Sequence, residues 1–144
     1  MSNSYSFILV KPQIGENIGA SARAIKNFGF SKLTIISPKQ SWPNAKAKAT
    51  AVGAYDVLKK AEIFNQTSDA IKNFDVIFAL SARKRDINKK HISFNQFQNI
   101  VNKKNKIKFG FMFGPEASGL SNEDLSYSNY ILQIPTSNFK SMNL

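Results

Sequence analysis

The sequence contains no cysteine, and this absence is the first restriction on its chemistry. Without thiols the chain can form no disulfide, no thiolate metal site and no cysteine nucleophile. Its single histidine, His91, follows Lys89 and Lys90 rather than other metal ligands, so we expect a surface histidine and no metal site. An apolar run of membrane-spanning length and an N-terminal signal pattern are also missing. These absences predict a cytoplasmic protein without a metal or a membrane partner.

The known phosphate-binding fingerprints are absent as well. The spacing Gly-X-Gly-X-X-Gly does not occur, and the glycines at positions 15 and 19 lack the Gly-Lys-Ser/Thr ending of a P-loop. Hydrolysis of a nucleoside triphosphate is therefore disfavoured. A nucleotide-binding α/β protein that lacks these fingerprints is a distant alternative.

Acidic residues are scarce, with 9 Asp and Glu against 20 Lys and Arg, which gives a net charge of +11. The excess is uneven, because Asp86 is the only acid between residues 83 and 108. Such a balance favours a polyanionic partner. Nucleic acid is favoured over a membrane, since no helix combines a basic face with an aromatic one. The alternative is that lysine and asparagine are simply abundant in this sequence and occupy solvated faces without binding a partner.

The chain is long enough for one domain with a sizeable core, and 42% of its residues are hydrophobic. Apolar runs predict strands at residues 5–10, 33–36, 62–64, 75–80, 106–113 and 130–134. Helical patterns lie between most of them, with residues 55–60 ambiguous. The alternation predicts an α/β fold with a mainly parallel sheet flanked by helices.

Helix boundaries follow from capping residues. We expect Gly29 to end the first helix. The last helix before the strand at 106–113 should bury Phe94, Phe97, Ile100 and Val101. The expected N-caps are Asn17, Asn44, Ser68, Ser93 or Asn95, and Ser121 with Asp124 in the capping-box position.

The loop after Phe113 has the form of a ligand site. Gly114 and Gly119 allow close approach of the backbone, and Ser121 restarts a helix. In open α/β sheets, ligands lie beyond the carboxyl ends of strands, where such strand-loop-helix turns occur. Glu116 in this loop is either a ligand contact or a solvated turn carboxylate.

Three polar clusters occur in a fixed order. Residues 17–23 read Asn-Ile-Gly-Ala-Ser-Ala-Arg, residues 113–121 read Phe-Gly-Pro-Glu-Ala-Ser-Gly-Leu-Ser, and Ile134-Pro135 is followed by Ser-Met-Asn-Leu at 141–144. With these motifs the whole chain resembles the SpoU (TrmH-like) RNA ribose 2′-O-methyltransferases of the SPOUT superfamily. Within them it is most similar to the TrmJ-like branch, which modifies the tRNA anticodon loop.

The resemblance implies a C-terminal trefoil knot that holds S-adenosylmethionine, and a homodimer whose active site uses both subunits. Hydrophobic periodicity alone would not suggest a knot. By position, the implied catalytic residues are Asn17, Arg23, Glu116, Ser141 and Asn143. The implied cofactor-binding residues, acting largely through backbone groups, are Leu80, Ser81, Ala82, Gly114, Ile134, Met142 and Leu144.

Methyl transfer to a ribose hydroxyl requires alignment of that hydroxyl, removal of its proton and exclusion of water. The family's proposed base corresponds to Arg23. A free guanidinium has a pKa above ~12, so Arg23 equally suits a clamp on the ribose phosphate and the developing alkoxide. From the helix pattern alone, Arg23 would be an exposed helix arginine.

The basic loop directly after the Leu80-Ser81-Ala82 segment is expected to contact the RNA backbone. Its cations are Arg83, Lys84, Arg85, Lys89 and Lys90.

Residues 1–144 are expected to form a single SPOUT methyltransferase domain without the usual C-terminal helix. We therefore expect weak cofactor binding. The alternative function is a catalytically impaired knotted module that binds RNA or dimerises.

Overall fold

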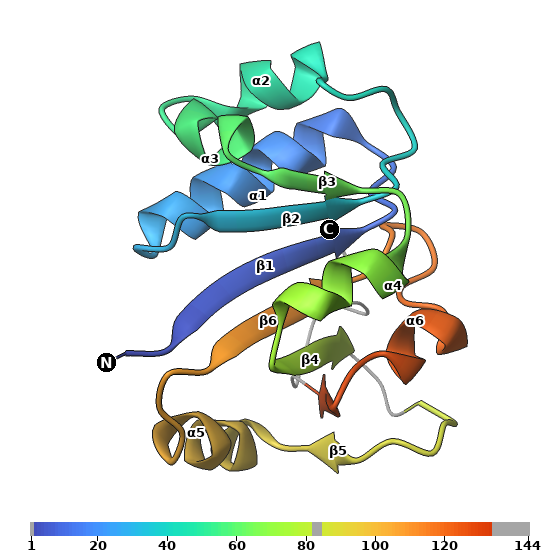
Figure 1. Cartoon of the computed structure of the whole chain (residues 1–144). Helices are drawn as coiled ribbons and strands as arrows, with labels where there is room; N and C mark the ends of the chain where they lie inside the picture. Colours follow the sequence, from blue (N-terminus) through green and yellow to red (C-terminus); the bar gives the residue numbers. More distant parts are fainter. Residues whose placement is uncertain (1, 82–84, 134–144) are drawn as a thin grey trace.

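A seven-stranded parallel sheet organises residues 2–81 and 85–133, the part of the chain that the computed structural model describes (Figure 1). The strand order is β3-β2-β1-β6-β4-β7-β5, and every pairing is parallel. The strands are β1 (Ser4–Val10), β2 (Lys32–Ile36), β3 (Glu62–Phe64), β4 (Val76–Ser81), β5 (His91–Ile92), β6 (Lys108–Phe113) and β7 (Tyr130–Gln133). The α/β class with a parallel sheet is therefore confirmed, and only the two-residue β5 was not expected.

The helices flank this sheet on both sides. They are α1 (Gly15–Asn27), α2 (Ala45–Ala51), α3 (Tyr55–Lys59), α4 (Thr67–Ala70), the 3-10 turn η1 (Ile71–Asn73), α5 (Phe94–Asn102) and α6 (Asn122–Ser126). The ambiguous segment at 55–60 is thus mostly helical. The expected knot involves residues after Gln133, which lie outside the described residues, so it stays a prediction.

Alternation along each strand divides the core between the two faces of the sheet. Leu9 and Ile35 point to the face that α1, α2 and α3 cover, where they pack with Ile18 of α1. Ile8 and the equivalent residues of β4 and β6 point to the other face, where Leu125 of α6 packs. Because both faces are covered, the strands read as nearly continuous apolar runs.

Aromatic rings fill the first face from β1 to β7. Phe78 is fully buried and stacks on Phe109, Phe111 and Tyr130, with ring centroids 5.7–5.8 Å apart. Phe97 of α5 meets Phe78 edge-on, with centroids 4.9 Å apart. This packing explains the high phenylalanine content, and it makes the middle of the sheet a rigid support for the loops at its ends.

Most expected helix ends are confirmed. The side chains of Asn44 and Ser121 each accept a backbone N–H in the first turn of α2 and α6, and Ser93 forms a full capping box with Gln96. After α1, Gly29 has a φ of +86°, and the next N–H returns to an α1 carbonyl as in a Schellman motif.

Three expectations about the helices were wrong, two about their starts and one about a buried residue. Asn17 lies inside α1, which begins at Gly15 because a carboxylate from another loop satisfies the helix start. Ser68 does not cap α4, since the helix already begins at Thr67, whose hydroxyl donates to the buried Asp124 carboxylate at 2.9 Å. Phe94 is 50% exposed because it is the first residue of α5, and Phe97 reaches the core instead.

Candidate active site

Four neighbouring strands, β1, β6, β4 and β7, end at one edge of the sheet (Figure 1). The loops that follow them include residues 11–14 after β1 and 114–121 after β6. Because the strands are parallel, these loops meet where open α/β sheets hold their ligands. This edge therefore contains the candidate active site.

Glu116 is the central side chain of the site. Its Oε1 accepts the backbone N–H of Gln13 at 2.8 Å, and its Oε2 accepts the N–H of Ile14 at 2.8 Å. The same Oε2 accepts the Nδ2–H of Asn17 at 3.2 Å. Ile14 is the N-cap of α1 and supplies no side-chain cap of its own. The Glu116 carboxylate therefore caps α1 from a distant loop, in the position where the helix dipole favours a negative charge.

The two loops are also joined in the opposite direction. The Gln13 side-chain oxygen accepts the backbone N–H of Ala117 at 3.0 Å. Gln13 and Ile14 were not predicted from the sequence, and no sequence signal indicated them because both bond Glu116 through backbone groups. Together these contacts form a clamp between the β1–α1 and β6–α6 loops.

Gly114, directly after β6, makes this loop possible. A side chain there would collide with the backbone nitrogen of Leu120 and the backbone of Gly119. The space beside the Gly114 α-carbon is thus filled by the backbone of the same loop. A cofactor contact through the Gly114 backbone stays a prediction.

Leu80 and Ser81, two further expected cofactor-binding residues, end strand β4. They are 9% and 6% exposed and pair with Leu132 and Gln133 of β7. Their position places them at the same sheet edge as Gly114, between the ends of β6 and β7. This arrangement fits a ligand held by backbone groups at the ends of adjacent strands.

Arg23 lies apart from this clamp. It is exposed and lines a cleft of about 490 Å³ with Lys26, Asn27 and residues 52–54. The Lys26 ammonium donates to the Gly53 carbonyl and to Asp56, both at 2.9 Å, and this contact lowers the pKa of Asp56. Arg23 itself has no hydrogen bond or ion pair within the described residues. Its guanidinium is therefore available to an anionic ligand.

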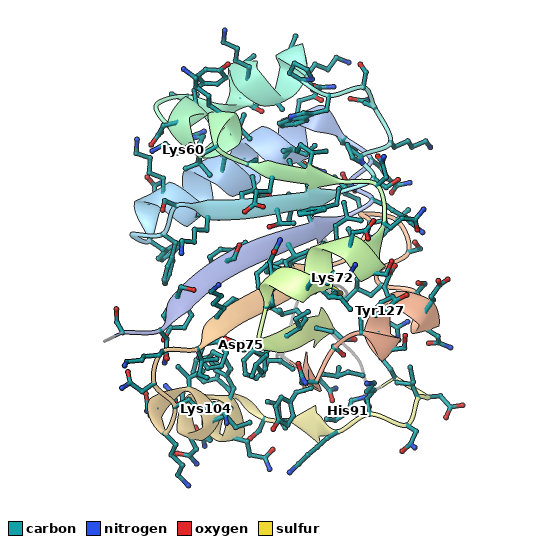
Figure 2. The ribbon with its side chains drawn as sticks, in the orientation of Figure 1. Lys60, Lys72, Asp75, His91, Lys104 and Tyr127 are labelled. Atoms are coloured by element: carbon teal, nitrogen blue, oxygen red, sulfur yellow. The ribbon has the colours of Figure 1, made fainter. Side chains whose placement is uncertain are left out.

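The basic loop after β4 is attached to the protein more firmly than expected. The Arg85 guanidinium donates to the Leu120 carbonyl at 2.6 Å, and Lys89 donates to the Ser128 carbonyl at 2.9 Å. His91, labelled in Figure 2, is half-buried at the start of β5. Its Nε2 accepts the Arg85 backbone N–H at 3.0 Å, and its Nδ1 lies 3.1 Å from the Lys89 carbonyl oxygen. The expectation of a surface histidine was wrong, because His91 fixes this loop.

Of the other predicted residues, Lys90 is exposed, as an RNA contact requires. The remaining ones lie outside the described residues: Ala82, Arg83, Lys84, Ile134, Ser141, Met142, Asn143 and Leu144. Within residues 2–81 and 85–133 no group of His, Asp and Glu side chains could hold a metal ion. The same residues contain no helix long and apolar enough to cross a membrane.

Comparison with known proteins places this geometry in a family. The model of the SpoU rRNA Methylase family matches residues 4–144. The chain belongs to the SpoU rRNA methylase family. The match includes the segments that carry Asn17, Arg23 and Glu116, so the clamp and the exposed arginine both lie within the family's region.

Individual SpoU relatives agree with this assignment. The tRNA (cytidine-2′-O-)-methyltransferase TrmJ of Methanocaldococcus jannaschii is 36% identical over 96% of the chain and 61% of its own length. The crystal structure of TrmJ from Z. mobilis superposes with a TM-score of 0.89 at 36% identity, over 96% of the chain and 62% of that protein. The chain thus spans about three fifths of the length of these relatives.

A more distant neighbour shares the fold alone. The SpoU methyltransferase AviRb from Streptomyces viridochromogenes, solved in complex with the cofactor AdoMet, has a TM-score of 0.73 at 14% identity. The superposition covers 96% of this chain and 53% of AviRb.

Proposed function

We propose that the protein transfers a methyl group from S-adenosylmethionine to a ribose 2′-hydroxyl in tRNA, in the anticodon loop. The observation that carries this proposal is the contact between Asn17 and Glu116, which joins two family motifs 99 residues apart at the carboxyl edge of the sheet. The TrmJ relatives supply the substrate class and AviRb the cofactor. Because tRNA is the proposed substrate, the proposed compartment is the cytoplasm.

The chemistry needs positioning more than a special reactive group. When bound, S-adenosylmethionine would supply an electrophilic methyl group on its sulfonium and would leave as S-adenosylhomocysteine after transfer to the aligned hydroxyl. Leu80, Ser81 and Gly114 would hold the cofactor at the strand ends, largely through their backbone groups. Arg23 would either accept the proton of the ribose hydroxyl as the base, or bind the ribose phosphate and stabilise the developing alkoxide while the proton passes to solvent. Glu116 keeps the loops around the reacting groups in place.

We propose that the enzyme works as a homodimer. Arg23 is six residues beyond Asn17, or ~9 Å along α1, and makes no contact with Asn17 or Glu116. Within the described residues of one chain, Arg23 therefore does not reach the Glu116 clamp. A second copy that presents its own Arg23 to this edge would complete the site, in agreement with the shared active site implied by the family resemblance.

Mass spectrometry after reaction tests the function directly. The purified chain is incubated with tRNA and S-adenosylmethionine, and nucleosides of the digested tRNA are compared before and after. We expect one nucleoside to gain a methyl group on its ribose, and Arg23→Ala to abolish the gain. RNA binding without any ribose methylation would instead support the impaired binding module and contradict the proposed function.

A further inference from the structure

Two lysines at the carboxyl edge have no partner in the described part of the chain. Lys11 follows β1 and Lys39 lies in the loop after β2, and both are exposed. They line an open cleft of about 460 Å³ together with Gln13, Ser37, Pro38, Pro115 and Ser118. Among the described residues the lining contains no acidic side chain that would neutralise its positive charge.

The backbone that carries these lysines is fixed. The Lys11 N–H donates to the Ile36 carbonyl at 2.7 Å, and the Lys39 N–H donates to the Pro12 carbonyl at 3.0 Å. The first residues after β1 and β2, Lys11 and Ser37, both adopt left-handed conformations, with φ of 49° and 48°. Non-glycine residues keep such conformations only where the surroundings hold them, and they concentrate at ligand sites. The cleft is therefore preorganised rather than formed by two independent loops.

The cleft lies directly beside the clamp. Gln13 belongs to both, and Pro115 and Ser118 flank Glu116 and Ala117 in the same loop. Two backbone N–H groups and the Asn17 amide donate hydrogen bonds to the Glu116 carboxylate. These donors reduce the electrostatic repulsion between Glu116 and an anion bound in the cleft. A ligand in the cleft would extend from the candidate active site toward β2.

The basic loop after β4 offers fewer free cations than its sequence indicates. The charged groups of Arg85 and Lys89 donate hydrogen bonds to backbone carbonyl oxygens of the protein. Lys11 and Lys39, which the charge pattern did not single out, lie on the other side of the β6 loop, and their ammonium groups have no partner within residues 2–81 and 85–133. Among the described residues, Lys11 and Lys39 of the β1 and β2 loops are therefore candidates for phosphate binding in addition to Lys90.

We propose that the cleft between the β1–α1, β2–α2 and β6–α6 loops binds a phosphodiester of the RNA substrate through Lys11 and Lys39. The proposal rests on the proposed function, since it places the strand next to the ribose that is methylated. Ammonium groups suit this role as mobile point charges, and they contribute affinity without sequence choice.

The test measures RNA binding of the full chain at several salt concentrations. The double variant Lys11→Gln and Lys39→Gln keeps polar side chains, each one bond shorter than lysine, and removes two charges. We expect roughly tenfold weaker binding of tRNA and a salt slope lower by about one to two, as the loss of two phosphate contacts predicts. Lys11→Arg with Lys39→Arg keeps the charges and should retain most of the affinity.

The matched control is Lys32→Gln with Lys104→Gln, which removes the same charge from positions near the amino ends of β2 and β6 (Figure 2 labels Lys104). If this control weakens binding as much as the cleft variant, the effect is one of net charge and the proposal is overturned. Unchanged binding by the cleft variant also overturns it.

Two further readouts separate this proposal from the proposed function. The cleft variant should bind S-adenosylmethionine as the unsubstituted chain does, while its KM for tRNA rises in proportion to the loss of RNA binding. If the unsubstituted chain methylates no tRNA, the proposed function is refuted. The proposed phosphodiester binding is still tested independently, by the difference in RNA binding between the cleft variant and the control variant.

Discussion

The amide of Asn17 donates a hydrogen bond to the carboxylate of Glu116 at 3.2 Å, across 99 residues of sequence. Two backbone N–H groups at the start of α1 donate to the same carboxylate. A carboxylate whose oxygens accept three hydrogen bonds from another loop is suited to holding the two loops together. Glu116 is therefore best understood as a positioning residue.

Replacing Glu116 by Gln should destabilise the fold by about 1–3 kcal/mol. Glutamine has one acceptor oxygen instead of two, so at least one donor of the α1 start loses its partner, and the negative charge at the helix start disappears. Urea denaturation checks the free energy of unfolding. Glu62→Gln, at an exposed position of β3, is the matched control and should change the stability by less than about 0.5 kcal/mol. Equal stability of the two variants would show that Glu116 does not cap α1.

Gly19 should resist a substitution that normally favours helices. A β-carbon there would collide with the Ala47 carbonyl and lie 2.8 Å from the Ala51 nitrogen of α2. We expect Gly19→Ala to cost about 1–3 kcal/mol through separation of α1 from α2, although alanine is the better helix former by up to ~1 kcal/mol. At the exposed Ala24 of the same helix, Ala24→Gly should be the destabilising change. Thermal unfolding of both variants gives the two signs, and a more stable Gly19→Ala would refute the close packing.

Local signals predicted most of the fold. The caps at Asn44 and Ser93 and the stop at Gly29 each depend on residues within one helical turn, so sequence alone could identify them. The start of α1 depends instead on Glu116, which no local pattern connects with Ile14. The short strand β5 exists only through its pairing with β7, and two residues carry too little periodicity to predict it.

The candidate site depends mainly on contacts between distant loops, so local sequence signals predict only part of it. Asn17 and Glu116, which the family resemblance assigned to the site, are in contact in the structure, and this agrees with the resemblance because family motifs carry information about distant contacts. Charge counting, by contrast, could not tell that Arg85 and Lys89 are bonded to carbonyls while Lys11 has no partner among the residues that the structure describes. Only the paths of the loops decide which cations face solvent.

Removing the acceptor of His91 should loosen the loop after β4. His91→Phe keeps a flat ring of similar size but leaves the Arg85 N–H without its partner. We expect a loss of about 1–2 kcal/mol and faster hydrogen exchange at the Arg85 amide, measured by NMR. Lys90→Ala, at the exposed neighbouring position, serves as the control and should leave this exchange rate unchanged. Equal exchange rates in His91→Phe and the unsubstituted chain would mean that other contacts hold the loop.

The ion pair of Lys26 and Asp56 should give a small pH-dependent contribution to stability. Its hydrogen bond with Lys26 lowers the pKa of the Asp56 carboxyl below its ordinary value. A group with a lowered pKa stabilises the folded state above its unfolded pKa, and the contribution is lost as the pH falls through the folded pKa. Asp56→Asn should therefore be less stable than the unsubstituted chain at neutral pH and equally stable in acid. Both side chains are about half exposed, so salt should reduce the difference at neutral pH. A difference in melting temperature that persists unchanged in acid would contradict this assignment.

Arg23 offers the sharpest separation of activity from stability. Its side chain is exposed and has no partner in the described residues, so Arg23→Ala should change the free energy of unfolding by less than about 0.5 kcal/mol. The same change should remove tRNA methylation. Arg23→Lys then distinguishes the two roles, because a lysine can lose its proton near pH ~10 whereas arginine remains charged. If Arg23 is a clamp, the lysine variant keeps reduced activity with an unchanged pH profile, since a positive charge is all that the step requires. If Arg23 is the base, the rate of the lysine variant rises with pH toward the pKa of its amine. The measurement is the methylation rate at saturating S-adenosylmethionine and tRNA over a series of pH values, with Lys46→Ala on the exposed surface of α2 as the control for charge loss.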